Sequence, residues 1–294
     1  MIHLPEAFIS QTKSLLGLEE TEALIKALSE EAPTSIRVNP NKATAISGES
    51  VPWCETGYYL SERPSFTLDP LFHAGAYYVQ EASSMFLSQV IKALPEEPRR
   101  VLDLCAAPGG KSTLWRAELP EQTLLVANEP IHRRAMILAE NLAKWGHPDV
   151  IVTEDYPKSF SHLLGCFDVI AADVPCSGEG MFRKDPGAID EWSKENVDFC
   201  AQRQFEIISD VWPALREGGF LVYSTCTFNR AENEDNIERI CLELGAETLP
   251  IPIKEEWKIR GSLTKDNLHV YHFFPHYTRG EGRSKERRVG KECL

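Results

Sequence analysis

The sequence predicts an α/β protein with a mostly parallel central sheet, preceded by a small α+β domain. Two observations lead to this prediction. From residue 99 onward, short apolar runs alternate with segments of helical apolar spacing, which implies a parallel sheet with helices on both faces. Residues 1–98 lack this alternation and contain a stretch rich in Pro, Gly and Ser. We therefore expect an N-terminal domain over residues 1–98 and a larger domain over residues 99–280.

The N-terminal domain is expected to combine two helices with short strands. PEAFISQTKSLLG and LEETEALIKALSEE both have helical apolar spacing. TSIRVNP then alternates like a strand and stops at Pro40, and residues 41–70 are expected to form loops and short strands. YYVQEASSMFLSQVIKAL has the pattern of a strand end that continues into a helix.

The larger domain is expected to alternate strands and helices. The predicted strands are RRVLDLCAA, TLLVANE, VIVTED, FDVIAAD and GFLVYSTC. The predicted helices are GGKSTLWRAEL, IHRRAMILAENLAKWG, NVDFCAQRQFEIISDVWPALREG with a kink at Pro213, and ENEDNIERICLELG. LHVYHFFPHYTRGEG predicts a further strand and a turn. Ligands of such sheets bind outside the carboxyl ends of the strands, so residues that follow a strand are candidate site residues.

The last residues, 281–294, differ from the rest of the chain. They are basic and show no apolar periodicity. We interpret them as a non-native tail, and a natural basic tail that touches RNA is the alternative. Because alternation is missing, we expect residues 283–294 to pack poorly and to add no full apolar strand.

Composition and charge exclude several classes of protein. No run of eighteen apolar residues is present and no secretory signal begins the chain, so we expect neither a membrane span nor secretion. Eight cysteines without a CxxC pair predict reduced thiols in a cytoplasmic protein, with no zinc site. The net charge of −13 disfavours non-specific wrapping of nucleic acid. An enzyme of nucleic acid with this charge must concentrate its cations in one groove or borrow them from another domain.

The first motif, DLCAAPGGKS, begins at Asp103 where a strand turns into a helix. Small residues let a ligand approach the backbone, and the helix N-terminus presents N–H groups to a carboxylate or phosphate. A phosphate-binding P-loop would need glycine where Cys105 stands, so we favour a nucleoside site. An ordinary strand–helix turn is the structural alternative. The candidate binding residues of this motif are Cys105, Ala106, Ala107, Pro108, Gly109, Gly110 and Lys111.

Two acids follow the next two strands. Glu129 stands where a carboxylate can accept both ribose hydroxyls of a nucleoside, although an acid at a helix N-terminus also has a structural reason to be there. Asp155 follows the third strand, where it could reach an adenine amino group or simply cap a helix.

The second and third motifs each contain a cysteine just past a strand end. DVPCSGEGMFRK places Asp173 and Cys176 with a Gly-x-Gly turn and two cations, a combination that a structural turn does not need. YSTCTFN places Cys226 where a strand meets a helix, whose dipole could lower the pKa of a nearby thiol. A single buried cysteine would more often have only a packing role. Two thiols at strand ends of one sheet instead indicate chemistry.

Together these blocks resemble the signature of a known family. DLCAAPGGKS, DVPCSGEGMFRKDP and YSTCTFNRAENE are similar, in this order, to blocks of the RNA (cytosine-5-)-methyltransferases, the Nop2/Sun family. The resemblance covers about residues 1–280, and its specific content lies between residues 99 and 236. CSGEGMFRKD is most similar to the bacterial small-subunit ribosomal RNA methyltransferase F subgroup. RVNP resembles part of the family's N-terminal, RNA-binding-type subdomain.

The resemblance implies a Rossmann-like methyltransferase fold and a cofactor, S-adenosyl-L-methionine. It places the cofactor against the first motif, Glu129, Asp155 and Asp173. Arg134 fits the family's pattern of an acid followed by an arginine, where it would hold the loop or RNA. No metal is implied. The expected partner is RNA, ribosomal RNA or the small ribosomal subunit, rather than DNA or a membrane, and we expect a monomer.

The resemblance also implies the roles of the thiols. Cys226 would attack carbon 6 of cytosine, which makes carbon 5 nucleophilic toward the sulfonium methyl group. Cys176 would assist release of the product, and Asp173 would hydrogen-bond the base. A thiol with a pKa of about 8.5 is mostly protonated at neutral pH, so Cys226 needs a positive or dipolar neighbour, and Lys111 is a candidate.

The sequence departs from the family's pattern in two places. An apolar strand usually follows the GEG turn, and the basic tail stands there instead. A C-terminal RNA-binding domain, usual in the ribosomal subgroup, does not follow. Four alternatives stay open: a transfer RNA cytosine-5 methyltransferase, a DNA cytosine methyltransferase that uses the Pro-Cys thiol, a P-loop ATPase, and a catalytically idle RNA-binding ribosome assembly factor.

Overall fold

The computed structural model describes residues 2–42, 46, 48–264, 268–280 and the backbone of 283–291. An eight-stranded sheet forms the centre of this part of the chain. The strand order is β10-β12-β9-β8-β5-β6-β7, with β11 paired to β12. From β9 to β7 every pair is parallel, and β10, β11 and β12 pair antiparallel. The strands are β5 (Arg100–Asp103), β6 (Leu124–Asn128), β7 (Val150–Thr153), β8 (Phe167–Asp173), β9 (Leu215–Thr225), β10 (Ala246–Leu249), β11 (Tyr271–Phe273) and β12 (Arg283–Lys291).

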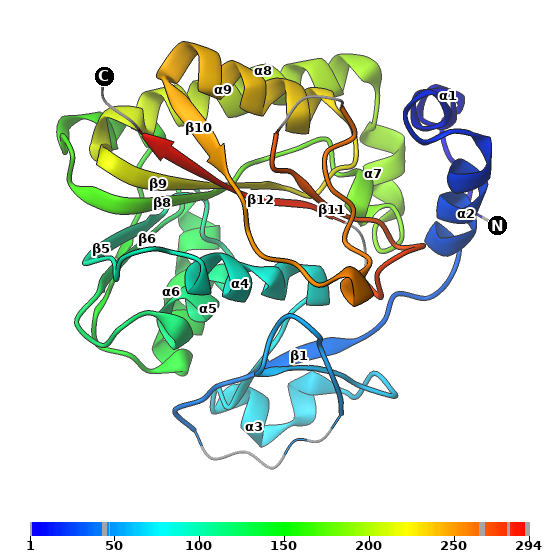
Figure 1. Cartoon of the computed structure of the whole chain (residues 1–294). Helices are drawn as coiled ribbons and strands as arrows, with labels where there is room; N and C mark the ends of the chain where they lie inside the picture. Colours follow the sequence, from blue (N-terminus) through cyan, green and yellow to red (C-terminus); the bar gives the residue numbers. More distant parts are fainter. Residues whose placement is uncertain (1, 43–45, 47, 265–267, 281–282, 292–294) are drawn as a thin grey trace.

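Helices cover both faces of this sheet, as the strand–helix alternation predicted (Figure 1). Successive residues of a strand point to opposite faces. Val101 and Leu125 therefore pack with α4 and α5, whereas Leu102 and Val126 pack with α8 and α9. Both faces are apolar, which explains the nearly continuous apolar runs of these strands. The helices are α4 (Leu87–Lys92), α5 (Gly110–Glu118), α6 (His132–Trp145), α7 (Pro186–Glu191), α8 (Lys194–Val211) and α9 (Asn236–Leu244).

The N-terminal part has the predicted mixture of helices and short strands. Its antiparallel sheet has the order β2-β3-β1-β4, and β1 ends just before Asn39 and Pro40. This sheet lies beneath the central sheet in Figure 1, next to α3. The elements are α1 (Glu6–Leu16), α2 (Leu18–Leu28), β1 (Ser35–Val38), β2 (Glu49–Ser50), β3 (Gly57–Tyr59), α3 (Pro70–His73) and β4 (Tyr77–Val79).

The first two helices do not pack on the N-terminal sheet. The Phe8 ring of α1 lies edge-on to Phe182 at 5.1 Å and to Trp192 at 5.6 Å, and all three belong to one buried cluster. Arg183 donates through its guanidinium to the carbonyls of Ala27 and Gly280. The start of the chain is thus built into the second motif of the larger domain.

One expectation about local structure is wrong. Pro213 does not kink a continuous helix. Instead α8 ends at Val211 and a short 3₁₀ turn, Trp212–Ala214, follows, because proline lacks the N–H that a helix needs. Residues 283–294 were expected to pack poorly and to add no full apolar strand. The backbone of residues 283–291 does form a strand, β12, between β9 and β10, although its sequence is not apolar. Strand pairing uses backbone N–H and C=O groups, so the open edge of β9 can pair with a segment that lacks apolar alternation.

Within the described residues, no helix has the length and apolar character needed to cross a membrane.

Arg37 joins the N-terminal sheet to the larger domain. It is fully buried, and its guanidinium donates to Gln80 Oε1 at 2.8 Å and to the Thr113 hydroxyl at 2.6 Å. The same group stacks on the Trp145 ring, 4.5 Å from its centroid. Burial lowers the pKa of Arg37 to about 10, so the group stays charged at neutral pH. β1 is thereby fixed to the start of α5.

We predict that Arg37→Ala lowers the free energy of unfolding by about 3 kcal/mol, because it leaves a cavity and unpaired buried acceptors. Urea denaturation measures this change. Arg63→Ala removes an exposed guanidinium that lies over Phe66 and serves as the control, with an expected change within about 0.5 kcal/mol. Equal unfolding midpoints for the two variants would contradict the prediction.

Candidate active site

The turn between β5 and α5 carries the first motif, and its backbone is held from several sides. Gly109 has a φ of +110°, and a Cβ there would lie 3.3 Å from a leucine side chain of α6, so glycine fits this position. The Ala106 N–H donates to the Asn128 carbonyl at 2.9 Å, and Asn141 Nδ2 donates to the Pro108 carbonyl at 2.7 Å. α6 and the end of β6 therefore fix the loop.

Asn128, which the sequence analysis missed, ties three strand ends together. Its side chain is buried, and Nδ2 donates to the carbonyls of Leu104 at 3.1 Å and Asp155 at 2.9 Å. Its Oδ1 accepts from the Thr153 hydroxyl at 2.9 Å and from the Asp155 N–H at 3.0 Å. The only local signal was an amide at the end of an apolar strand, directly before Glu129.

The two predicted acids lie at neighbouring strand ends, but in different surroundings. Glu129 is buried, accepts from the Ile131 N–H at 3.0 Å and pairs with Arg134 at 3.2 Å. Arg134 also lies 3.4 Å from the Ala107 carbonyl, so it connects this acid to the first motif. Asp155 is exposed after β7, with its backbone fixed by Asn128.

A cavity of about 280 Å³ lies at the carboxyl ends of the parallel strands, between the first motif, the second motif and β4. It brings together most of the first motif with Asp173. Glu129, Arg134 and Asp155 are not among its lining residues. Those residues are Tyr78, Val79, Gln80, Glu81, Ser84, Cys105, Ala106, Ala107, Pro108, Gly110, Lys111, Asp173, Met181 and Lys184.

Lys111 and Asp173 form an ion pair at the wall of this cavity, with Lys111 Nζ 2.5 Å from Asp173 Oδ1. The Ser224 hydroxyl donates to the same carboxylate at 2.8 Å. Lys111 was named as a candidate positive neighbour of Cys226, and the structure pairs its ammonium with Asp173. The lysine thus fixes the carboxylate at the end of β8.

The two cysteines of the second and third motifs meet. Cys176 Sγ lies 2.6 Å from Cys226 Sγ, and the Cys226 N–H donates to Cys176 Sγ at 3.2 Å. The parallel register, in which Asp173 faces Ser224, brings both loops to one edge of the sheet. The hydrogen bond with Cys226, together with burial, raises the pKa of Cys176 well above its ordinary value. Cys176 therefore keeps its proton at neutral pH.

Other side chains of the second motif act differently from what its sequence suggested. The cations Arg183 and Lys184 were read together, but Arg183 binds carbonyls near the N-terminal helices, and Lys184 lines the cavity. Two buried glutamates, Glu179 and Glu232, bind the backbone around the two cysteines. Sequence reasoning assigned them no role, because their partners lie about fifty residues away along the chain.

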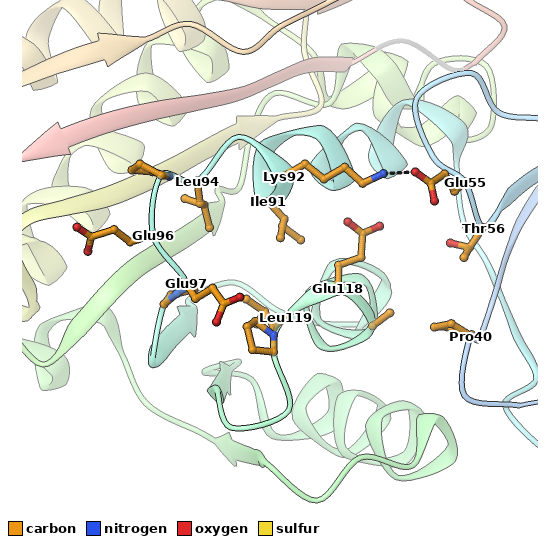
Figure 2. Close-up of a pocket in the computed structure, with 14 residues that line it drawn as sticks. Pro40, Glu55, Thr56, Ile91, Lys92, Leu94, Glu96, Glu97, Glu118 and Leu119 are labelled. Atoms are coloured by element: carbon orange, nitrogen blue, oxygen red, sulfur yellow. Dashed lines mark hydrogen bonds and ion pairs between the residues drawn. The ribbon is translucent and has the colours of Figure 1, made fainter.

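A second, larger cavity of about 420 Å³ contains none of the predicted site residues (Figure 2). It is lined by the segment before β5 and the segment after α5, which places it at the amino ends of the strands. Figure 2 shows Lys92 pointing to Glu55, 2.6 Å away, with Glu118 beside them. Because sheets of this kind bind ligands at the carboxyl ends, the smaller cavity is the candidate active site.

The fold and this edge of the sheet are those of the Rossmann-like, S-adenosylmethionine-dependent methyltransferases. Within this class, the chain belongs to the 16S rRNA methyltransferase RsmB/F family, whose family model matches residues 90–283. The N-terminal domain of 16S rRNA methyltransferase RsmF matches residues 4–82.

Curated relatives are similar over much of the chain. Ribosomal RNA small subunit methyltransferase F of Escherichia coli O157:H7 is 37% identical over 267 residues, which cover 85% of this chain and 54% of the relative. The protein of that name from Serratia proteamaculans is 33% identical over 300 residues, covering 96% and 62%. The chain thus spans about half to three fifths of the length of these relatives.

Solved structures show the same fold. A methyltransferase homolog protein from Pyrococcus horikoshii superposes with a TM-score of 0.82 at 25% identity, covering 98% of this chain and 95% of that one. NSun6 from Pyrococcus horikoshii, solved with SFG, superposes with a TM-score of 0.84 at 20% identity, covering 99% of each chain.

We predict that Asn128→Ala weakens S-adenosylmethionine binding about tenfold, because three strand ends lose the amide that joins them. Isothermal titration calorimetry measures the dissociation constant. Thr153→Val removes one of the four hydrogen bonds of Asn128, so its effect should stay below about threefold. An unchanged dissociation constant for Asn128→Ala would show that the amide does not shape the cofactor site.

Proposed function

We propose that the chain transfers a methyl group from S-adenosylmethionine to carbon 5 of cytosine in RNA, through a covalent adduct with Cys226. The observation that carries this proposal is the meeting of two thiols from neighbouring strand ends. Cys176 and Cys226 lie 2.6 Å apart, at the same edge of the sheet as Asp173. Two thiols beside an acid provide a nucleophile, a second thiol and a group that can bind the base.

The residues at the strand ends fit the cofactor. Gly109 and the helix N-terminus after it leave backbone open to a ligand, and the buried Glu129 offers a carboxylate where a ribose would lie. Asp155 follows the next strand, where its carboxylate would accept a hydrogen bond from the adenine amino group. Arg134 holds both Glu129 and the loop. When bound, S-adenosylmethionine supplies an electrophilic methyl group on its sulfonium.

The side chains divide the remaining work. Cys226 as thiolate forms a bond to carbon 6 of cytosine, and the electron pair moved to carbon 5 takes up the methyl group. A base then removes the carbon-5 proton, the bond from carbon 6 to sulfur breaks, and the thiolate leaves. Cys176, whose raised pKa keeps it protonated, can donate a hydrogen bond to Cys226 across the 2.6 Å between the two sulfurs. Asp173, held by Lys111 and Ser224, binds the base edge.

We propose small-subunit ribosomal RNA as the substrate. The family and the names of the relatives support this choice. A transfer RNA is the alternative within the same chemistry. A DNA-type mechanism would use Cys176 of the Pro-Cys pair as the nucleophile, and an idle assembly factor would need neither thiol.

Alanine variants of the two cysteines should show different defects in methylation. Cys226→Ala should abolish methylation and leave no protein–RNA adduct, because no bond to carbon 6 can form. Cys176→Ala should slow product release and trap the protein on RNA in a covalent complex that survives a denaturing gel. Single-turnover methylation and gel electrophoresis with labelled RNA measure both effects.

Cys54→Ala is the matched control, because Cys54 is a buried cysteine of the N-terminal part, and this variant should methylate and release RNA normally. If Cys226→Ala traps RNA and Cys176→Ala is inactive, the nucleophile is Cys176 and the mechanism is of the DNA type. If Cys176→Ala loses stability without trapping RNA, Cys176 is only a packing residue.

The choice of RNA has its own test. Purified protein with S-adenosylmethionine should convert a cytosine of small ribosomal subunits to 5-methylcytosine, and transfer RNA should stay unmodified. Bisulfite sequencing of both RNAs identifies the position. Conversion of transfer RNA alone would replace ribosomal RNA as the proposed substrate.

A further inference from the structure

Glu179 of the second motif reaches across to the loop that carries Cys226. It is 1% exposed, and its Oε2 accepts from the N–H groups of Phe228 at 2.7 Å and Asn229 at 2.9 Å. Its Oε1 accepts from Trp192 Nε1 at 3.1 Å. The carboxylate thus fixes the backbone two and three residues after Cys226.

Glu232, just after the third motif, reaches in the opposite direction. It is fully buried, and its Oε2 accepts from the Ser177 N–H at 2.9 Å and from Gln204 Nε2 at 2.7 Å. The Ser177 hydroxyl donates to its Oε1. Ser177 directly follows Cys176, so this carboxylate fixes the backbone of the other cysteine.

The two glutamates therefore form a reciprocal pair. Glu179 comes from the segment of Cys176 and binds the backbone after Cys226, whereas Glu232 comes from the segment after Cys226 and binds the backbone after Cys176. Asn229 lies between them, and its Nδ2 donates to Glu179 at 3.1 Å and to Glu232 at 2.8 Å. Burying two carboxylates so close together is costly unless each is fully hydrogen-bonded. A merely structural contact between two loops could be made with apolar side chains at lower cost.

We propose that Glu179 and Glu232 are positioning residues that set the distance between the thiols of Cys176 and Cys226. This inference rests on the proposed function, in which both thiols serve one cytosine. Neither glutamate needs to touch the base, since each acts through the backbone beside a cysteine.

Glutamine variants test the proposal, because Glu179→Gln and Glu232→Gln keep the volume but replace one acceptor oxygen with a donor. The first readout is the rate at which diamide oxidises Cys176 and Cys226 to a disulfide, followed by mass spectrometry. In that step the two thiols lose two electrons and two protons to diamide, so neither RNA nor cofactor is needed. We expect the rate to fall about tenfold in each variant. The second readout is methylation, where kcat should fall about tenfold and KM for S-adenosylmethionine should stay within about twofold.

The matched control is Glu234→Gln. Glu234 is buried like Glu232 and lies in the same helical turn, Ala231–Asp235. It instead accepts from the Leu263 N–H at 3.1 Å and pairs with His272 at 2.8 Å. Its variant should form the disulfide at the wild-type rate. Trp192→Phe removes one donor to Glu179 while keeping a ring in place, so it gives a milder variant, with about threefold slowing, if the glutamine variants do not fold.

Two results would overturn the proposal: wild-type disulfide rates in both glutamine variants, or equal slowing in Glu234→Gln, which would mean that any buried carboxylate of this region has the same effect. A wild-type chain that forms the disulfide but methylates no RNA would count against the proposed function. The positioning of the thiols would still be judged from the oxidation rates.

Discussion

The parallel pairing of β8 with β9 determines where the chemistry of this protein can occur. Because Asp173 faces Ser224 in register, the loops after both strands leave the sheet at the same edge and on neighbouring paths. β5 pairs with β8 on the other side, so the glycine-rich turn begins beside Asp173. A shift of the register by one residue would turn side chains to the opposite face and separate the thiols. The site therefore depends on backbone hydrogen bonds before it depends on any side chain.

The electrostatic interactions at this edge of the sheet depend on a few partly buried ion pairs rather than on the net charge of the chain. The chain carries −13, yet the cations near the cavity are few and each has a defined partner or place: Lys111 on Asp173, Arg134 on Glu129, and Lys184 at the wall. Charges in a partly buried site interact more strongly than on the surface. A small number of positioned cations can thus give this edge of an acidic protein local positive charge.

Much of this arrangement could be predicted from the sequence, because it depends on local patterns. Apolar runs gave the five parallel strands, and motifs after those runs gave the turn at Gly109 and both cysteines. What escaped prediction depends on partners that are distant along the chain. Asn128 matters because three strand ends converge on it, and Arg183 binds Ala27, 156 residues away. β12 escaped because pairing to an open edge needs backbone groups and no apolar pattern.

The packing of α1 against the second motif has a consequence for how the protein is made. Phe8 leaves the ribosome long before the rings that bury it, Phe182 and Trp192, are synthesised. The first two helices must therefore wait, with an apolar face open to water, until most of the chain has been translated. Phe182 and Phe228 belong to the same apolar cluster, so this cluster can be completed only after Phe228 has been synthesised. A ribosome that stalls before this point would carry a nascent chain whose first two helices have not yet found their packing partners.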